Sequence, residues 1–262
     1  MSDIDNVNGA ALAGEEVAPQ GPTMDQTLME EMVKAGVLYG RKKAKTHPRM
    51  KPFIFGTRNG IEILELPKTM ETIEKAGDFL KETAKKDGLV LVVGTKPASQ
   101  DLMETFAKKF SYPYVVKRWL GGTLTNFKTL LTRTQYYMNL KADKATGKLE
   151  KYTKKERVAF DKQIEKMEGF FLGLERLSRL PDAVIVVNVN DHITVVREAK
   201  RMKIPVVAIL STDTDPEVVE YPIPANDNSR NSIAWILGRL EAKVEQGLKE
   251  RPASAAAVAA TK

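Results

Sequence analysis

AVIVVNVNDHITVVREAKRMKIPVVAIL, residues 183–210, decides the fold of this chain. Two apolar runs, 183–189 and 205–210, enclose a segment in which Ile193, Val196 and Ala199 recur at helical spacing. Short apolar runs of this kind are typical of strands that are covered on both faces. A strand, a helix and a second strand in this order indicate parallel strands joined by a right-handed crossover.

The same alternation precedes this stretch. LVLVV (89–93) and YPYVV (112–116) are predicted strands, with a helix marked by Leu102, Phe106 and Phe110 between them. Earlier still, Asn59-Gly60 separates two β-rich runs and predicts a hairpin. Helices are expected from Pro67 and after YPIP, where an apolar stripe runs to Val244. The sequence therefore predicts an α/β fold with a parallel sheet and helices on both faces.

Residues 125–180 interrupt this alternation. One helical stripe runs from Phe127 to Met138, and polar residues around Gly147 break it. The following stripe, Phe160, Ile164, Met167, Phe171 and Leu174, has the 4-3-4-3 spacing of a coiled-coil seam. The pattern predicts an inserted antiparallel helical hairpin, 125–180, within an α/β domain formed by 24–124 and 181–249.

Both ends of the chain have a different composition. Residues 1–23 are rich in Ala, Gly, Asn and acids, and we expect a disordered acidic tail. Residues 250–262 are expected to be an Ala-rich flexible tail. The 262 residues contain no Cys, no apolar run of about 20 residues and no secretory signal in the first 30, which fits the cytoplasm and no membrane span.

Charge is distributed unevenly along the chain. Residues 1–31 hold seven acids and no Lys or Arg, so residues 32–262 carry 41 basic residues against 27 acids, a net charge of +14. A body this basic favours a polyanionic partner, although a merely soluble basic protein is the alternative. The most basic part is residues 34–58, with eight Lys or Arg and no acid. Lys and Arg neutralise phosphates, so this stretch indicates nucleic-acid binding. Tyr39, Phe53 and Phe55 are interleaved with these cations, and such rings can stack on exposed bases. For Phe53 and Phe55 we expect instead the role of core residues in an edge strand.

The motifs of nucleotide chemistry are missing. The loop after residues 89–93 reads GTKPASQ, with one glycine where a dinucleotide fingerprint needs three. Gly121-Gly122 could form an anion nest, but its more frequent role is to turn the chain. The two histidines, His47 and His192, lie far apart. In TDTDPE, Asp213 and Asp215 could hold Mg²⁺, although capping of the next turn is the more frequent role.

Several motifs in a fixed order carry a family resemblance. They are KAGVLYGRKKAKTHPRMKPFIFGTRNGIEILEL, LVVGTK, RWLGGTLTNFKT, LPDAVIVVN and IPVVAILSTDTDPEVVEYPIPANDN. Over residues 27–245 the chain resembles the bacterial family of the second small-subunit ribosomal protein. The resemblance implies a Rossmann-like (flavodoxin-like) domain with an inserted coiled coil, and a role in the ribosome that is not enzymatic.

The resemblance also implies partners, whereas the candidate site residues come from the basic stretch and the glycine turn. The partners are small-subunit ribosomal RNA and neighbouring ribosomal proteins, including the large protein that captures messenger RNA. No cofactor and no small-molecule substrate are expected. Trp119, Gly121 and Gly122 are predicted to form the turn between the strand 112–116 and the first helix of the inserted hairpin. The residues expected to contact RNA are Arg41, Lys42, Lys43, Lys45, His47, Arg49, Lys51, Arg58, Lys96, Lys117, Arg118, Asn126, Lys128 and Arg133.

The chain departs from the family pattern at one place. The family commonly reads G-V-H-F-G-H where this chain has Leu38 and Arg41 in place of the two histidines. Those histidines can join an aspartate in holding a metal in some members, so no metal site is expected here. We expect Arg41 instead to donate hydrogen bonds to a phosphate of the nucleic acid.

Two other functions stay open from the residues alone. One is a Rossmann-type enzyme that binds a nucleotide at residues 94–96 and at Gly121-Gly122. The other is a protein-interaction module in which the hairpin is the functional part and the basic charge is incidental.

Overall fold

The computed structural model describes residues 26–251 and contains a five-stranded parallel sheet. The strand order is β5-β4-β6-β7-β8, and each neighbouring pair is parallel. The strands are β4 (Val90–Val93), β5 (Tyr114–Val115), β6 (Ala183–Val187), β7 (Val206–Leu210) and β8 (Tyr221–Pro224). In sequence order within this sheet, the arrangement is 2-1-3-4-5, the flavodoxin-like order of Rossmann-like folds. The predicted α/β class and parallel sheet are therefore confirmed.

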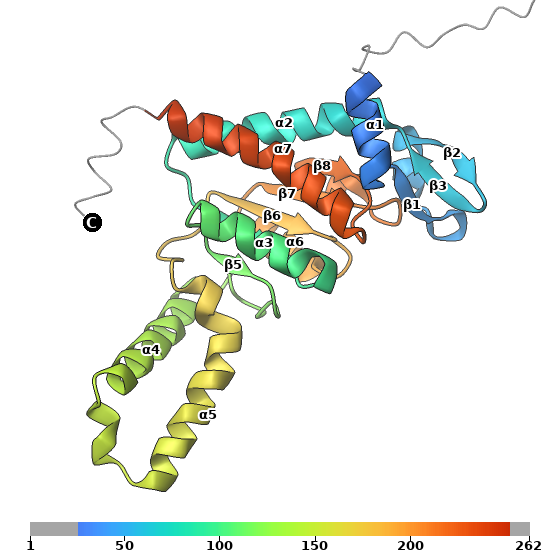
Figure 1. Ribbon diagram of the computed structural model, residues 1–262. Coiled ribbons are helices and arrows are strands. Elements are labelled where there is room, and N and C mark those ends of the chain that lie inside the picture. Colours follow the sequence, from blue (N-terminus) through green and yellow to red (C-terminus); the bar gives the residue numbers. More distant parts are fainter. Residues whose placement is uncertain (1–25, 252–262) are drawn as a thin grey trace, which may run out of the picture.

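Helices cover both faces of this sheet (Figure 1). One layer consists of α2 (Leu66–Lys85), α3 (Pro97–Lys109) and α7 (Arg230–Lys249). The other face packs against α6 (Ile193–Arg201) and against the segments that flank the inserted helices. The side chains of Val90 and Val92 enter the first layer, whereas those of Leu91 and Val93 enter the second. This alternation explains why the strands had to be apolar throughout.

A second, smaller sheet lies at one end of the molecule, beside α1 (Gln26–Ala35) (Figure 1). Its antiparallel order is β1-β3-β2, with β1 (Tyr39–Lys42), β2 (Ile54–Arg58) and β3 (Ile61–Leu64). Asn59 and Gly60 both have positive φ, +52° and +75°, as a tight hairpin turn requires. The predicted hairpin is confirmed. The 3₁₀ turns η1 (Lys43–Lys45) and η2 (Pro48–Phe53) carry the basic stretch from β1 to β2.

Two long helices lie on the connection from β5 to β6. They are α4 (Phe127–Ala145) and α5 (Lys154–Phe171), joined through η3 (Lys148–Lys151) and followed by η4 (Leu172–Leu174). In Figure 1 they extend away from the sheet, on the side of β5. Tyr137 and Phe171 lie with their ring centroids 6.2 Å apart, and Lys144 pairs with Asp161 at 2.7 Å. The two helices therefore contact each other at both of these levels.

The structure corrects one boundary and leaves others untested. Of the predicted strand 112–116 only Tyr114 and Val115 pair, because β5 is an edge strand and Pro113 has no N–H to donate. The predicted tails, 1–23 and all but the first two residues of 250–262, lie outside the described residues. None of the helices within 26–251 is long and apolar enough to cross a membrane.

Candidate nucleic-acid interface

The carboxyl edge of the main sheet is where Rossmann-like folds bind ligands, at the point where the strand order reverses. Here that point lies between β4 and β6, and His192 lies beside it. The imidazole is 3% exposed. Its Nδ1 lies 2.8 Å from the Asn188 carbonyl, and its Nε2 lies 3.0 Å from the Thr95 hydroxyl. Burial lowers the pKa of His192. The ring is thus a neutral bridge between the ends of the two strands.

Two of the cations predicted at this edge, Arg41 and Lys96, are held by carboxylates of the same chain. Arg41 pairs with Asp227 at 2.7 Å and with Asp213 at 3.4 Å. Lys96 pairs with Asp191 at 3.0 Å, and its Nζ donates to the side chain of Asn228 at 3.1 Å. The crevice that would take a nucleotide in an enzyme of this fold therefore contains the chain's own ion pairs.

Asp227 shows how far this network is removed from water. The residue is 1% exposed, and burial raises its pKa to about 6, against the opposing effect of Arg41 and Lys96. The 2.7 Å contact with Arg41 alone would lower the pKa, so burial outweighs the ion pair. The Arg41 side chain is also only 21% exposed. It is therefore an internal counter-ion and is poorly placed to donate hydrogen bonds to a phosphate.

Arg41 also fixes the small sheet to the main sheet. Its backbone N–H donates to Thr212 Oγ1 at 2.8 Å, and the His47 N–H donates to the Thr212 carbonyl at 2.8 Å. A Cβ at Gly40 would lie 2.5 Å from the Thr212 side chain, so only glycine allows this approach. The small sheet is consequently held in a fixed position relative to the end of β7.

The double-glycine turn holds an anion, and that anion belongs to the chain itself. Gly122 has φ +89°, and its N–H donates to Glu198 Oε1 at 2.9 Å. Trp119 Nε1 donates to the same oxygen at 3.0 Å, and Leu124 N donates to Oε2 at 3.0 Å. Burial raises the pKa of Glu198, but the hydrogen bonds from Trp119, Gly122, Leu124 and Thr125 outweigh it and hold the pKa below the ordinary value. The nest is an internal joint between this turn and α6.

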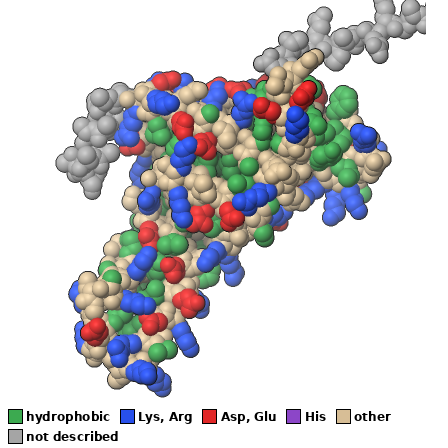
Figure 2. All heavy atoms as spheres, viewed as in Figure 1, with side chains coloured by type: hydrophobic (Ala, Val, Ile, Leu, Met, Phe, Trp, Pro, Cys, Tyr) green, Lys and Arg blue, Asp and Glu red, His purple; other side chains and the backbone are tan. Residues whose placement is uncertain are grey.

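The remaining predicted cations face solvent and make no ion pair with any residue of 26–251. They are Lys42, Lys43, Lys45, Lys51, Arg58, Lys117, Arg118, Lys128 and Arg133. The first five belong to the small sheet and its 3₁₀ turns. Figure 2 shows Lys and Arg side chains together along one edge of that end of the molecule. Lys117 and Arg118 line a hollow of about 350 Å³ with Trp119 and His192.

The other predicted residues divide between the two groups. Arg49 is half-exposed, and it pairs with Asp215 at 2.6 Å and Glu217 at 3.1 Å. His47 is the N-cap of η2, where its Nδ1 accepts the Arg49 N–H at 3.3 Å. Asn126 is exposed at the start of α4. Only the cations without an internal partner are available to neutralise phosphates.

The aspartates of TDTDPE, residues 212–217, have structural roles. Asp215 caps η5 (Pro216–Val218) by accepting the Glu217 N–H at 3.0 Å, and Asp213 pairs with Arg41. Among the described residues, no group of three or more His, Asp or Glu is placed to hold a metal ion. The sequence reasoning missed Glu198 and Asp227. Glu198 carried a usable signal, because it is an acid between Val195 and Ala199 on the buried stripe of α6.

These features define a class. The chain is a Rossmann-like protein whose glycine turn binds its own Glu198 and whose ligand edge contains its own ion pairs beside the hollow of Lys117, Arg118 and His192. A family model described as "Ribosomal protein S2" matches residues 32–247. The chain belongs to the ribosomal protein S2 family, whose members are ribosomal structural proteins and not enzymes.

Individual relatives agree with the family match. The protein named small ribosomal subunit protein uS2 from Thermus thermophilus is 40% identical over 211 residues, which are 80% of this chain and 82% of the relative. The uS2 protein of Coprothermobacter proteolyticus is 38% identical over 223 residues, 85% of this chain and 83% of the relative. The uS2 protein of Deinococcus radiodurans is 37% identical over 217 residues, which are 83% of this chain and 82% of the relative.

Proposed function

We propose that this chain is a structural constituent of the small ribosomal subunit in the bacterial cytoplasm, and that it binds ribosomal RNA through the cations of its small sheet. Membership of the S2 family supports the ribosomal role and implies ribosomal RNA and ribosomal proteins as partners. The observation that carries RNA binding is the set of exposed Lys and Arg without partners among the described residues, because such cations release counterions when they meet phosphates.

The pairing pattern ranks the predicted contacts. Lys42, Lys43 and Lys45 are exposed next to each other, so they are expected to contribute most to binding. Arg41 and Lys96 would have to leave carboxylates before meeting a phosphate, so they are expected to contribute little. Lys117, Arg118, Lys128 and Arg133 are proposed as a second contact area at the base of α4.

The test is the salt dependence of affinity for small-subunit ribosomal RNA. Each phosphate contact contributes roughly −0.7 to −0.9 to the slope of log affinity against log salt. Replacing Lys42, Lys43 and Lys45 by Ala should reduce that slope by about 2 to 3. The control replaces Lys75, Lys86 and Lys249, which are exposed on and next to α2 and at the end of α7. It makes the same change in net charge and should leave the slope unchanged. Equal effects of the two triple variants would contradict the proposal.

We further infer that residues 125–180 form an antiparallel coiled-coil hairpin that helps anchor the neighbouring protein that captures messenger RNA. Ile164 and Phe171 are buried, as are Leu130 and Tyr137 on α4, which supports a common seam. The hairpin also exposes apolar side chains, with Tyr136 42% and Val158 47% exposed, as a protein-binding surface would.

Removing the hairpin separates its role from that of the small sheet. A short Gly-Ser linker would replace residues 128–179, and purified small subunits would be analysed for both proteins. We expect the shortened chain to enter the subunit while recovery of the mRNA-capturing protein falls. Full recovery of that protein would show that the hairpin is not its anchor.

A further inference from the structure

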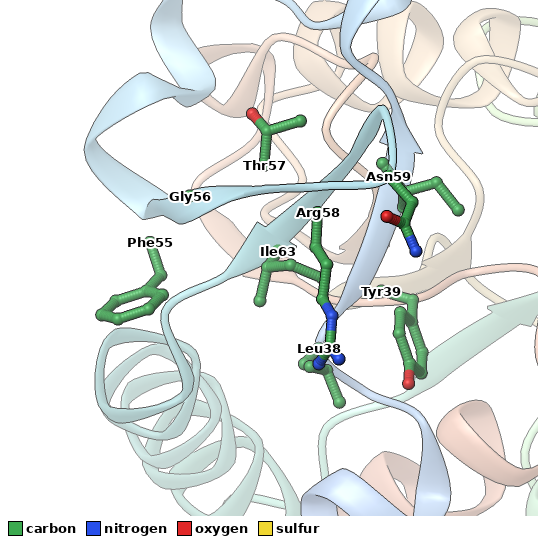
Figure 3. A pocket seen from close by; sticks show the side chains of 9 residues that line it. Leu38, Tyr39, Phe55, Gly56, Thr57, Arg58, Asn59 and Ile63 are labelled. Carbon is green, nitrogen blue, oxygen red and sulfur yellow. The ribbon is translucent and has the colours of Figure 1, made fainter.

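The outer face of the small sheet contains a hollow of about 570 Å³ (Figure 3). Leu38, Gly56 and Ile63 are among the residues that line it. Phe55 lies at one end, and Tyr39 lies beside Arg58 at the other (Figure 3). The hollow is open, and two aromatic rings border it.

The aromatic side chains at this hollow are unusually exposed. Phe55 is 81% exposed and Tyr39 48%, so the expectation that Phe55 is a core residue was wrong. Single exposed apolar residues are common on protein surfaces. Two rings and Ile61, which is 38% exposed, present apolar surface at one hollow, and Thr57, Arg58 and Asn59 add polar groups to its lining. Apolar or planar groups of a ligand can cover such a surface.

The lining of the hollow has one charged side chain, that of Arg58. No acid of residues 26–251 lines it, and Arg58 makes no ion pair with the described residues. Lys42 and Lys51, on the strand and the 3₁₀ turn next to it, are exposed and equally free within 26–251. A ligand that brings flat apolar faces together with negative charge satisfies both features. Unpaired nucleotides have this chemistry, since each base has a π face and each linkage a phosphate.

We propose that the hollow binds unpaired bases of ribosomal RNA, which stack on Phe55 and Tyr39 while Arg58 meets an adjoining phosphate. This inference rests on the proposed RNA-binding function and specifies its substrate. Bases within a continuous A-form helix offer no free face, so the RNA at this hollow is a loop, a bulge or a strand end. An apolar side chain of a neighbouring protein would also fit the hollow, but it would leave the surrounding cations without partners.

The test compares three RNA probes with the full chain. They are an adenine-rich single strand of 12 nucleotides, an abasic ribose-phosphate oligomer of the same length, and a 12-base-pair duplex. We expect the single strand to bind more tightly than the abasic oligomer by roughly 5- to 150-fold for each stacked base. Phe55→Leu should remove most of this ratio and leave the salt slope unchanged, whereas Phe55→Trp should retain it. Tyr152→Leu, at another exposed ring, is the control.

The outcomes separate this inference from the proposed function. Equal affinity of the native chain for the single strand and the abasic oligomer overturns stacking, while a steep salt slope with ribosomal RNA would still support RNA binding. Absence of any RNA binding would sink both. If Phe55→Leu leaves the base preference intact but weakens association with small subunits that lack this protein, the hollow takes a protein side chain, and the inference is wrong.

Discussion

At the scale of the residue, the most informative group is the carboxylate of Glu198. A buried charge is stable only where fixed donors replace its water shell. Three backbone N–H groups, the Trp119 indole and the Thr125 hydroxyl do this for Glu198. The same geometry would hold a phosphate if the carboxylate were absent. The side chain of one residue thus turns a potential anion site into a structural joint.

Glu198→Gln tests this joint. The amide keeps the shape but removes the charge and turns one acceptor into a donor that faces other donors. We expect the variant to lose about 3 kcal/mol of unfolding free energy, which lowers Tm by roughly 6–12 °C. Calorimetry measures this, with Glu168→Gln on the exposed face of α5 as the control. A Tm equal to that of the control would show that the carboxylate contributes little.

At the scale of the element, α4 and α5 share apolar side chains on one side and present charge on the other. Residues 128–179 hold 13 Lys or Arg and 7 Asp or Glu. Ile164, at 8% exposed, lies in the middle of the seam predicted from spacing. The helix α5 begins with a capping box, in which Thr153 accepts the Glu156 N–H and Glu156 accepts the Thr153 N–H. Its start is therefore fixed locally, whereas its position depends on packing against α4.

Ile164→Asp should separate the two helices without unfolding the sheet. A buried carboxylate with no partner is unfavourable, so α4 and α5 are expected to lose hydrogen-exchange protection. Peptides from β4, β6 and β7 should keep theirs. Lys162→Asp, on the exposed side of α5, should leave both regions protected. Equal loss in α4, α5 and the sheet would mean that they fold as one cooperative unit, and no loss anywhere would contradict the proposed coiled coil.

The elements differ in how far the sequence could reveal them. Strands β6 and β7 were predictable because their burial on both faces requires unbroken apolar runs. The Asn59-Gly60 turn was predictable because few residues tolerate its positive φ. The charge pairs were not, since Arg41 meets Asp227 across 186 residues and only the completed topology makes them neighbours. The exposure of Phe55 was missed because β-rich sequence does not show which face of a small sheet stays uncovered.

At the scale of the whole molecule, the contact of Arg41 with Asp227 holds the small sheet against the main one. The contact is a buried pair in which burial raises the pKa of Asp227 to about 6. A carboxyl group whose pKa is higher in the folded state than in the unfolded state, here about 3.9, binds the proton more strongly when folded. Its contribution therefore lowers stability as pH rises from about 4 to about 6. Glu198 acts in the opposite sense, and its contribution is lost as pH falls through its lowered pKa.

The pH dependence can be measured directly. The native chain should lose up to about 3 kcal/mol of unfolding free energy between pH 4 and pH 7 relative to Asp227→Asn, which cannot titrate. Urea unfolding at each pH gives this difference, and NMR of the Asp227 carboxyl carbon should show a midpoint near 6. A midpoint near 4 with no relative loss would mean that Arg41 offsets the burial completely.

The joint at Glu198 can form only late in synthesis, because its two sides lie far apart in the chain. Gly122 leaves the peptidyl-transferase centre 76 residues before the acid that it binds, which is roughly 4–15 s at ordinary bacterial elongation speeds. Until then the donors of this turn lack the carboxylate that they bind in the complete fold. Glu198 is added with α6, and Asp227, which pairs with Arg41 of the small sheet, is added later still. The contacts that fix the glycine turn and the small sheet can therefore form only after most of the chain has been synthesised.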